Sequence, residues 1–416
     1  MKAVTEGAPD YVIRVFDDPA GIDAAAWDAL LLAQAAPSPF MRHAYLSALH
    51  ASGSATTATG WAPHFVTLWQ GHVLVAACPL YVKDHSYGEY VFDWAWANAY
   101  AQHGLDYYPK AVAAVPFTPV PGARLLACDA AARAALVAAV VQFCGEASLS
   151  SLHLLFGADD DIAACAQAGL MLRHTVQFHW SNLSAPMPPE GELAAVERPG
   201  GGSGYRDFDH FLATLSQEKR KKIRQERRKV REAGVSFRWA RGADITGDDW
   251  DFFYRCYERT YLEHGNAPYL TRDFFHRMQQ AMPENWLLFI AEHEAGAGPE
   301  PIASSLIALG HDADGALACY GRYWGALARV DCLHFEACYY RPIEWCIDHG
   351  AVRFEGGAQG EHKMARALMP VKTTSAHWLA HPAFADAVER FLEREGAGIG
   401  NYLEHLEGRS PFRRAD

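Results

Sequence analysis

The two halves of this chain repeat the same order of predicted secondary-structure elements. Each half begins with a strand hairpin and continues with an aromatic strand, a long helix and a further strand, and each ends on a strand that carries a His-Trp pair. Chance agreement is the alternative, because every α+β domain alternates strands and helices. Five elements in one order favour a duplication, so the sequence predicts two modules of similar fold.

Hydrophobic periodicity places the elements of each module. Hairpins with alternating apolar and polar residues precede the helical crossovers. We therefore expect an α+β fold in which each module is a mixed, mostly antiparallel sheet flanked by helices. The expected elements are hairpin 64–84, aromatic strand 87–96, helix 132–147, strand 151–156, short helix 162–168 and strand 176–182 in the first half, and hairpin 286–309, aromatic strand 316–324, helix 332–350, strand 351–357, segment 363–368, strand 375–380 and a last helix that ends at Gly396 in the second half.

A seam rich in Pro, Gly and Glu separates the halves at residues 185–204, where apolar periodicity disappears. We interpret this seam as a linker or a long loop. The predicted domains are therefore residues 1–184 and residues 205–416.

Composition narrows the classes of function. The 416 residues carry a formal net charge of −12 and half of them are hydrophobic, which argues against a disordered chain and against a DNA-binding protein with a basic surface. No apolar run reaches the ~18 residues of a membrane-spanning helix, and the first residues lack the apolar core of an export signal. We therefore expect a cytoplasmic protein with no membrane span.

The nine cysteines show neither CxxC pairs nor zinc-type spacing. Most of them lie within apolar stretches, so we expect reduced core residues rather than disulfides or metal ligands. The sequence predicts no metal site.

One segment reverses the charge of the chain. Residues 218–232 contain nine basic and three acidic side chains, a charge of +6, so the remainder of the chain carries −18. Helical periodicity predicts a basic helix over residues 216–233, with Ile223 and Val230 on a thin apolar stripe. Either this helix is a solvated face supported by i,i+4 ion pairs, or it contacts the phosphates of a substrate.

Four passages of the sequence carry a family resemblance. They are the basic helix SQEKRKKIRQERRKVREAGV before a strand, the aromatic strand YGRYWG, the passage FEGGAQGEHKMARALMPV and the first-half passage YAQHGLDYYPKAVAAVPFTPVPGARLL. Together they resemble the Fem-type branch of the GNAT acyltransferase superfamily, in particular its bacterial members described as peptidoglycan biosynthesis or recognition proteins. The resemblance extends from Phe40 to Phe412.

The resemblance implies two tandem GNAT-like domains that transfer an acyl or aminoacyl group to an amine. Fem proteins use aminoacyl-tRNA and cell-wall precursors, whereas ordinary GNAT enzymes use acyl-CoA. The sequence departs from a standard GNAT enzyme at residues 325–337, which stand where the (Arg/Gln)xxGx(Gly/Ala) pyrophosphate loop is expected. This departure counts against acyl-CoA, which stays a candidate donor beside tRNA, and no tightly bound cofactor is expected.

The first candidate site is the glycine-rich loop that follows strand 351–357. Glycines allow backbone N–H groups to approach an anion closely, and basic side chains one turn apart neutralise phosphate or carboxylate. A loop whose glycines serve only the shape of a turn is the alternative. The candidates are Gly356, Gly357, Gly360, Lys363 and Arg366 for substrate binding, and Glu361 and His362 for catalysis.

The second candidate site lies within residues 100–110, on a predicted loop of the first half. Its aromatic and charged residues suit a polar substrate held against an aromatic wall. His103 or Asp106 is the candidate that takes a proton from an attacking amine, and Tyr107, Tyr108 and Lys110 are binding candidates. An ordinary packed loop is the alternative.

The third candidate site combines the aromatic strand of the second half with the helix that follows it. In a GNAT-like fold this strand lies beside the gap that receives the acyl donor, and a backbone N–H there polarises the acyl carbonyl. Arg322 is expected to bind an anion, because an arginine on a buried strand needs such a partner. Tyr323 and Trp324 are further binding candidates, and Glu336 or His334 is the candidate base.

These observations predict an N-acyl- or aminoacyltransferase that moves a group from acyl-CoA or aminoacyl-tRNA to an amine of a phosphate-bearing precursor. We expect no DNA partner. The alternative is a non-catalytic or degenerate transferase that binds a peptidoglycan-type precursor or peptide.

Overall fold

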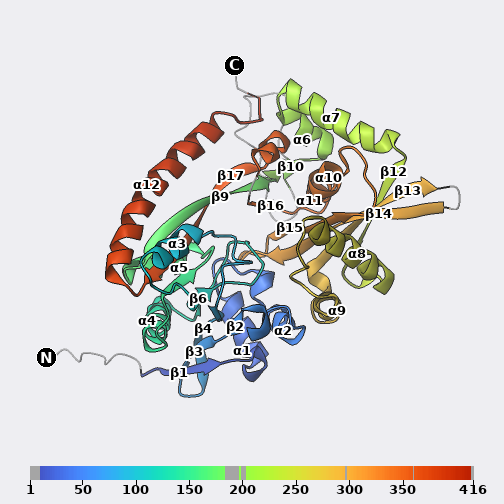
Figure 1. Cartoon of the computed structure of the whole chain (residues 1–416). Helices are drawn as coiled ribbons and strands as arrows, with labels where there is room; N and C mark the ends of the chain where they lie inside the picture. Colours follow the sequence, from blue (N-terminus) through green and yellow to red (C-terminus); the bar gives the residue numbers. More distant parts are fainter. Residues whose placement is uncertain (1–9, 183–195, 198–202, 296–297, 359, 414–416) are drawn as a thin grey trace. The chain divides into compact units, whose positions relative to one another are not determined.

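The computed structural model describes residues 10–182, 196–197, 203–295, 298–358 and 360–413 (Figure 1). The chain forms two compact units, and each is built from two separate stretches of sequence. Unit 1 is Met1–Arg173 with Thr374–Arg394, and unit 2 is His174–Thr373 with Glu395–Asp416.

These units differ from the predicted domains, because a late segment of the chain belongs to unit 1. Most of the predicted linker 185–204 lies outside the described residues. The described part of it is two short strands that pair with each other, β10 (Val196–Glu197) and β11 (Ser203–Gly204).

Unit 1 contains two sheets and several helices. In chain order its elements are β1 (Val12–Phe16), α1 (Ala24–Leu32), α2 (His43–Ala51), β2 (Ala62–Pro63), β3 (Phe65–Gln70), β4 (Val73–Cys78), β5 (Leu80–Lys83), α3 (Trp94–Gln102), β6 (Lys110–Ala113), β7 (Leu126–Ala127), α4 (Ala130–Glu146), β8 (Ser151–Leu154), α5 (Asp159–Gln167), the later part of β17 (Met369–Leu379) and the earlier part of α12 (Pro382–Glu407).

The first sheet of unit 1 has the antiparallel order β1-β3-β4-β7, and the second has the order β2-β5-β6-β8-β17. Pro79 lies between β4 and β5, where the chain passes from one sheet to the other. Helix α4 begins at Asp129, whose side chain caps the first turn. Its Leu136 and Val140 pack with Val66 and Leu152 of the two sheets, so one apolar core holds both sheets to α4.

Unit 2 contains a larger sheet and the basic helix. In chain order its elements are β9 (Met171–Ser181, which begins in unit 1), α6 (Phe208–Thr214), α7 (Gln217–Glu232), β12 (Val235–Arg241), α8 (Gly247–Glu263), α9 (Arg272–Ala281), β13 (Trp286–Ala295), β14 (Gly298–His311), β15 (Leu317–Ala326), α10 (Leu333–Phe335), a π-helical turn η6 (Glu336–Tyr340), α11 (Arg341–Asp348), β16 (Arg353–Ala358), a 3-10 turn η7 (Glu361–Arg366), the earlier part of β17 and the end of α12.

The sheet of unit 2 has the order β12-β13-β14-β15-β16-β9. Strands β15 and β16 are parallel and the other neighbours are antiparallel. A core of large apolar side chains lies under α6, α11 and the end of α12, with Trp180, Phe211, Ile343 and Phe354 among its buried members.

The sheets of the two units repeat one topology. In unit 1, β5, β6, β8 and β17 follow one another with antiparallel, parallel and antiparallel pairing. In unit 2, β14, β15, β16 and β9 follow with the same three pairings. The repeat supports the predicted duplication, with one exchange: β17 closes the sheet of unit 1 although it comes from the second half, and β9 of the first half closes the sheet of unit 2.

Two predicted elements are wrong. The aromatic strand expected at 87–96 is absent, and residues 94–102 form helix α3. Trp96 and Tyr100 lie four residues apart, so a helix buries both on one face, where they pack with Leu392 of α12. Helix α12 also continues past Gly396 to residue 407, because Leu406 is buried in the core of unit 2.

The predicted α+β class, with mixed and mostly antiparallel sheets flanked by helices, is confirmed. The basic helix is also confirmed as α7, which buries Ile223 and Val230. Within the described residues, no helix is long and apolar enough to cross a membrane, and no group of three or more His, Cys, Asp or Glu side chains could hold a metal ion.

We expect Gly325→Ala to destabilise unit 2. Gly325 of β15 lies against α8, and a Cβ placed there would come within 1.9 Å of the Cys256 carbonyl oxygen. Forcing the helix from the strand should lower the free energy of unfolding by about 1–3 kcal/mol, measured by urea denaturation. Gly398→Ala is the control, because Gly398 faces open space on α12 and alanine there should raise stability by roughly 0.5 kcal/mol. Equal effects of the two substitutions would contradict this packing.

Candidate functional site

Strands β15 and β16 pair over a short distance and then part. Their parallel register runs from Ala318 opposite Arg353 to Tyr320 opposite Glu355. Beyond this point β15 continues along β14, with Tyr323 opposite Leu306. The later residues of β16 instead follow β9. The separation opens a gap inside the sheet of unit 2.

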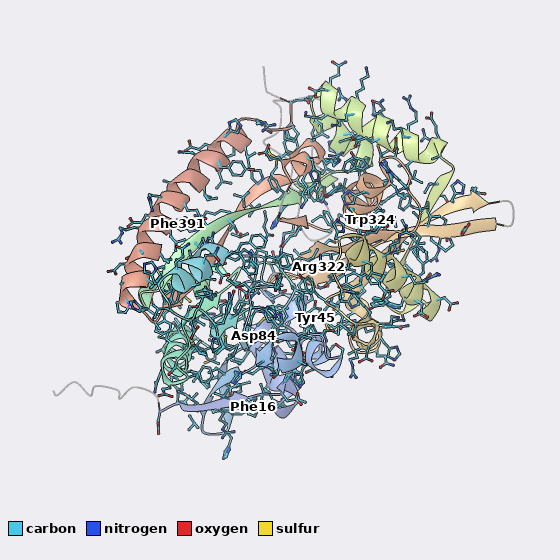
Figure 2. The ribbon with its side chains drawn as sticks, viewed as in Figure 1. Phe16, Tyr45, Asp84, Arg322, Trp324 and Phe391 are labelled. Atoms are coloured by element: carbon cyan, nitrogen blue, oxygen red, sulfur yellow. The ribbon has the colours of Figure 1, made fainter. Side chains whose placement is uncertain are left out.

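A β-bulge marks the side of this gap that belongs to β15. Leu306 of β14 pairs with Tyr323 of β15, but the next residue of β14, Ile307, pairs with Gly321. Arg322 is therefore an extra, unpaired residue of β15. A bulge re-aims the side chain at that position. The Arg322 guanidinium lies 5.0 Å from the centre of the Tyr323 ring and donates to its hydroxyl at 3.3 Å. Figure 2 shows Arg322 and Trp324 on this strand.

The gap contains a pocket of about 150 Å³, which we call the splay pocket. Both parted strands and the helical segment after β15 supply its walls. The lining residues are Ser305, Gly321, Arg322, Tyr323, Trp324, His334, Cys338, Tyr339, Phe354 and Gly356. The structure thus brings together five of the residues singled out in the sequence, Arg322, Tyr323, Trp324, His334 and Gly356, at one place.

Gly356 allows the backbone to pass close to its neighbours at the pocket wall. A Cβ at this position would lie 2.3 Å from Cδ2 of Leu368 and 2.9 Å from the Phe178 carbonyl oxygen. Even an alanine would therefore displace the Leu368 side chain and press on the backbone of β9.

Lys363 contacts the backbone of Gly356. It belongs to the turn η7, is 6% exposed, and its Nζ donates to the carbonyl oxygens of Gly356 at 2.6 Å and Gly357 at 3.3 Å. Burial lowers the pKa of Lys363 to about 8, against a smaller opposite effect of Cys338. A lysine tuned in this way gains or loses its proton near neutral pH.

Arg366 and the two residues before Lys363 have other surroundings. Arg366 is buried, donates to Glu226 of α7 at 2.8 Å and to the His362 carbonyl oxygen at 2.8 Å, and lies 3.6 Å above the Phe335 ring. Glu361 is exposed and pairs with Arg409, and His362 is exposed. Arg366 therefore holds η7 in place, and Glu361 points away from the core of the site.

Glu336 faces away from the splay pocket, although it begins the π-helical turn that lines it. Its carboxylate is 2% exposed and accepts from Arg227 at 3.1 Å, and Arg341 lies at 2.9 Å. Burial raises the pKa of Glu336, against the lowering effect of the two arginines. A carboxylate held by two guanidinium groups is poorly placed to accept a proton from a substrate. Short π-helical turns are frequent at functional sites, and here the turn also presents Cys338 and Tyr339 to the pocket.

His334, two residues before Glu336, does line the pocket. It packs edge-on against Trp324 and Tyr339, with ring centres 5.5 and 5.6 Å apart. Loss of hydration and the nearby cationic groups lower the pKa of His334. The ring is therefore neutral at pH 7 and has a nitrogen lone pair free of a proton, although the lowered pKa makes it a weaker base than an ordinary histidine.

The candidates within residues 100–110 separate into two environments in unit 1. His103 and Asp106 are exposed, and His103 caps the end of α3 through the Ala99 carbonyl oxygen. Tyr107 and Lys110 are buried instead. Tyr108 is half-buried and bonds to Ser86 at 2.8 Å.

Lys110 is the centre of a buried polar network that sequence patterns did not reveal. Its ammonium donates to Asp93, and to Glu89 and Ser86 at 2.8 Å each. The Tyr107 hydroxyl donates to the Asp93 carboxylate at 2.6 Å and lies 3.1 Å from Nε2 of His153, so it links these two residues. The members are Lys83, Ser86, Glu89, Asp93, Tyr107, Lys110, Ser151, His153 and His377.

The network shifts the titration of its members. Burial lowers the pKa of Lys83 to about 7 and raises the pKa of Glu89 to about 7. Burial would raise the pKa of Asp93, yet the ammonium of Lys110 holds it below its usual range. Burial also lowers the pKa of His377 to about 3. Two ammonium groups, Lys83 and Lys110, thus face two carboxyl groups, Glu89 and Asp93, within unit 1.

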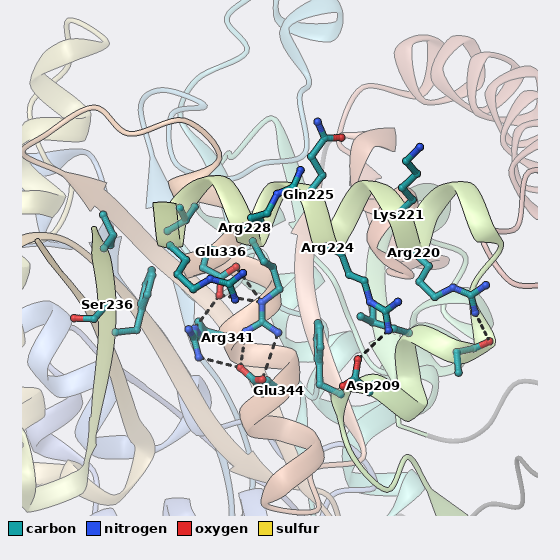
Figure 3. A pocket seen from close by; sticks show the side chains of 18 of the residues that line it. Asp209, Arg220, Lys221, Arg224, Gln225, Arg228, Ser236, Glu336, Arg341 and Glu344 are labelled. Atoms are coloured by element: carbon teal, nitrogen blue, oxygen red, sulfur yellow. Dashed lines mark hydrogen bonds and ion pairs between the residues drawn. The ribbon is translucent and has the colours of Figure 1, made fainter. Parts of the chain in front are cut away.

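A second cavity of unit 2, of about 1390 Å³, follows helix α7 (Figure 3). We call it the α7 groove. Arginines of α7 point into it opposite α6, β12 and α11, and Glu336, Arg341 and Glu344 form a bonded group at its floor. Its lining residues are Phe208, Asp209, Leu212, Ala213, Gln217, Arg220, Lys221, Arg224, Gln225, Arg227, Arg228, Val230, Arg231, Val235, Ser236, Phe237, Glu336, Arg341 and Glu344.

Comparison with known proteins places this geometry in a family. The model of the FemAB-like family, described as peptidoglycan biosynthesis/recognition, matches residues 19–414. The chain belongs to the FemAB-like family. No curated protein is significantly similar to the chain in sequence.

FemX and L-PGS are two solved structures that share the fold. FemX has a TM-score of 0.50 at 9% identity, over 90% of this chain and 100% of FemX. L-PGS from Bacillus licheniformis has a TM-score of 0.51 at 11% identity, over 90% of this chain and 98% of its own. A tandem GNAT protein from the clavulanic acid biosynthesis pathway matches 90% of this chain and 99% of its own, at 11% identity and a TM-score of 0.44. The resemblance seen in the sequence passages is confirmed.

Acid should destabilise unit 1 through His377. The folded chain keeps this ring neutral down to about pH 3, whereas the unfolded chain protonates it near pH ~6.5. The unfolded state binds more protons between these values, so the free energy of unfolding falls as the pH decreases, by up to about 1.4 kcal/mol per pH unit for this group. Urea titrations between about pH 7 and about pH 5 should show a shallower loss for His377→Gln. His264→Gln, at an exposed position, should keep the wild-type slope, and a wild-type slope in His377→Gln would refute the assignment.

Proposed function

We propose that this chain is an N-acyl- or aminoacyltransferase whose reaction takes place in the splay pocket of unit 2. The observation that carries the proposal is the parting of β15 and β16 around a pocket that a neutral histidine lines, with the buried Lys363 bonded to the carbonyl oxygen of the lining residue Gly356. Membership of the FemAB-like family supports an acceptor related to peptidoglycan. The donor is acyl-CoA or aminoacyl-tRNA.

The parted strands suit the binding of an acyl group. The acyl carbonyl enters beside β15, where backbone N–H groups that are not used for pairing with β16 can stabilise an oxyanion. The acceptor amine attacks the carbonyl carbon, and the bond from this carbon to the donor sulfur or oxygen breaks. The proposal needs no tightly bound cofactor.

His334 and Lys363 take the two protein roles in this proposal. His334 accepts the proton of the attacking amine at a ring nitrogen and returns it to the leaving thiol or hydroxyl. Lys363 holds the Gly356 and Gly357 carbonyl oxygens and places positive charge behind the pocket, where it stabilises a developing oxyanion. Glu336 has no part in proton transfer, because Arg227 and Arg341 hold it.

We expect Lys363→Ala to reduce the rate of transfer by about 100-fold or more, in line with the loss of one electrostatic contact to a transition state. The rate is measured as thiol release from acyl-CoA, or deacylation of aminoacyl-tRNA, in the presence of an amine. Lys372→Ala removes an exposed lysine of β17 and should leave the rate unchanged. An unaltered rate in a folded Lys363→Ala protein would remove this lysine from the mechanism.

The same assay separates the enzyme from a binding protein. Turnover of either donor that depends on an amine supports the proposal. Thermal stabilisation by muropeptides, with neither donor consumed in the presence of any amine tested, would overturn it in favour of a recognition protein.

A further inference from the structure

The side chains that line the α7 groove carry more positive than negative charge. Seven cationic and three acidic side chains line it. Two of the acids, Glu336 and Glu344, are bound by Arg227 and Arg341 at its floor. The remaining lining charges are five cations and Asp209. Outside this helix segment the chain carries −18, so the groove is a local exception in an acidic protein.

The arginines that face the groove repeat along one side of α7. Arg220, Arg224, Arg227 and Arg231 recur at intervals of three or four residues, which puts them on one helix face. Figure 3 shows Arg220 and Arg224 on the side of α6, with Lys221 and Gln225 directed the other way. At 1.5 Å per residue the row extends about 16 Å.

These contacts leave the row open to a ligand. Arg224 pairs with Asp209 at 3.1 Å, and both side chains are exposed. Exposed pairs of this kind contribute about 0–1 kcal/mol and exchange easily for a phosphate. The Arg231 side chain is exposed, and its guanidinium makes no hydrogen bond or ion pair within the described part of the chain.

We propose that the α7 groove is a binding site for a chain of phosphates. Guanidinium groups match phosphate oxygens in pairs, and a row of about 16 Å accommodates several phosphates at the ~3.4 Å axial spacing of a nucleic-acid strand. A single pyrophosphate would contact only part of the row. A nucleic-acid strand and a free polyphosphate share this chemistry, and the test below distinguishes them.

Two adjacent residues of α7 connect the groove to the walls of the splay pocket. Arg227 bonds to Glu336, the first residue of the turn that presents Cys338 and Tyr339. Glu226 bonds to Arg366 of η7 and to the hydroxyl of Tyr340. A phosphate that draws Arg227 from Glu336 therefore loosens the π-helical turn. Through this link, a ligand bound in the α7 groove changes the wall of the splay pocket. The functional meaning of the link rests on the proposed function.

Direct binding to the full chain tests the site. Affinities for a short single-stranded RNA and for inorganic tripolyphosphate are measured with the wild type and with the triple variant Arg220→Gln, Arg224→Gln, Arg231→Gln. The dissociation constant of the RNA should rise at least about tenfold in the variant, and the salt dependence of log K should weaken by about 2. The control Arg255→Gln, Arg259→Gln, Arg277→Gln removes the same charge from α8 and α9 and should bind as the wild type does.

Each result of these binding measurements either supports or overturns the proposed site. Tighter binding of RNA than of tripolyphosphate supports a nucleic-acid strand, and equal binding supports a free polyphosphate. Binding of neither probe, or equal weakening in the two triple variants, would overturn the site. A protein that binds RNA through α7 yet transfers no acyl group would refute the proposed function alone.

The link to the pocket has a readout that needs no turnover. Cys338 lies in the pocket wall and Cys128 is exposed in unit 1. Alkylation followed by mass spectrometry should show a change of about threefold or more in the rate at Cys338 when the RNA is bound, as expected where local opening shifts by roughly 0.7 kcal/mol. The rate at Cys128 should stay constant. The change should disappear in Arg227→Gln, and a constant rate at Cys338 in the wild type with RNA bound would overturn the link.

Discussion

The geometry of unit 2 depends on how few hydrogen bonds join β15 to β16. Neighbouring parallel strands usually stay together for their whole common length, because each pairing satisfies backbone groups that would otherwise be buried alone. Here the two strands pair at three positions and then follow different partners. Whatever lies between them must satisfy their polar groups. The turn η6, the bulge at Arg322 and Lys363 all lie around this opening.

The two units use the same topology for different purposes. In unit 1 the parallel pair β6 and β8 carries Lys110 and His153, and charged and polar side chains fill the space near their first residues. A buried ion network of this kind contributes little net stability but is costly to break. In unit 2 the corresponding parallel pair opens at its far end into a pocket. The same topology thus holds a buried ion network at the parallel pair of unit 1 and a pocket at the parallel pair of unit 2.

Sequence patterns predicted the parts of this structure that are local. The fold class, helix α7 and the grouping of Arg322 with Trp324 follow from periodicity and from adjacent positions in the chain. The network around Lys110 was missed because Glu89, His153 and His377 come from distant segments, and only the strand order brings them together. The aromatic segment before Trp96 was misassigned, because the spacing of its aromatic residues fits both a strand and a helix until the partner α12 is known.

Glu336 shows the limit of the sequence for individual roles. It lies two residues after His334 in the chain, and the sequence made either residue a candidate base. One turn of π-helix then directs them to different cavities, His334 to the splay pocket and Glu336 to the α7 groove. Glu336, a candidate for proton transfer in the sequence, instead binds two arginines at the floor of the cationic α7 groove.

The exchange of β9 and β17 determines when each unit can be completed during synthesis of the chain. Unit 1 lacks its closing strand and the helix beside it until residues 374–394 have been synthesised, about 200 residues after Arg173. At ~5–20 residues per second this delay lasts roughly 10–40 s. During it the edge of β8 has no neighbour from its own unit on one side, and an open strand edge attracts other chains. A nascent protein of this design therefore needs either a slow-forming core or a chaperone to cover that edge until the last tenth of the sequence has been synthesised.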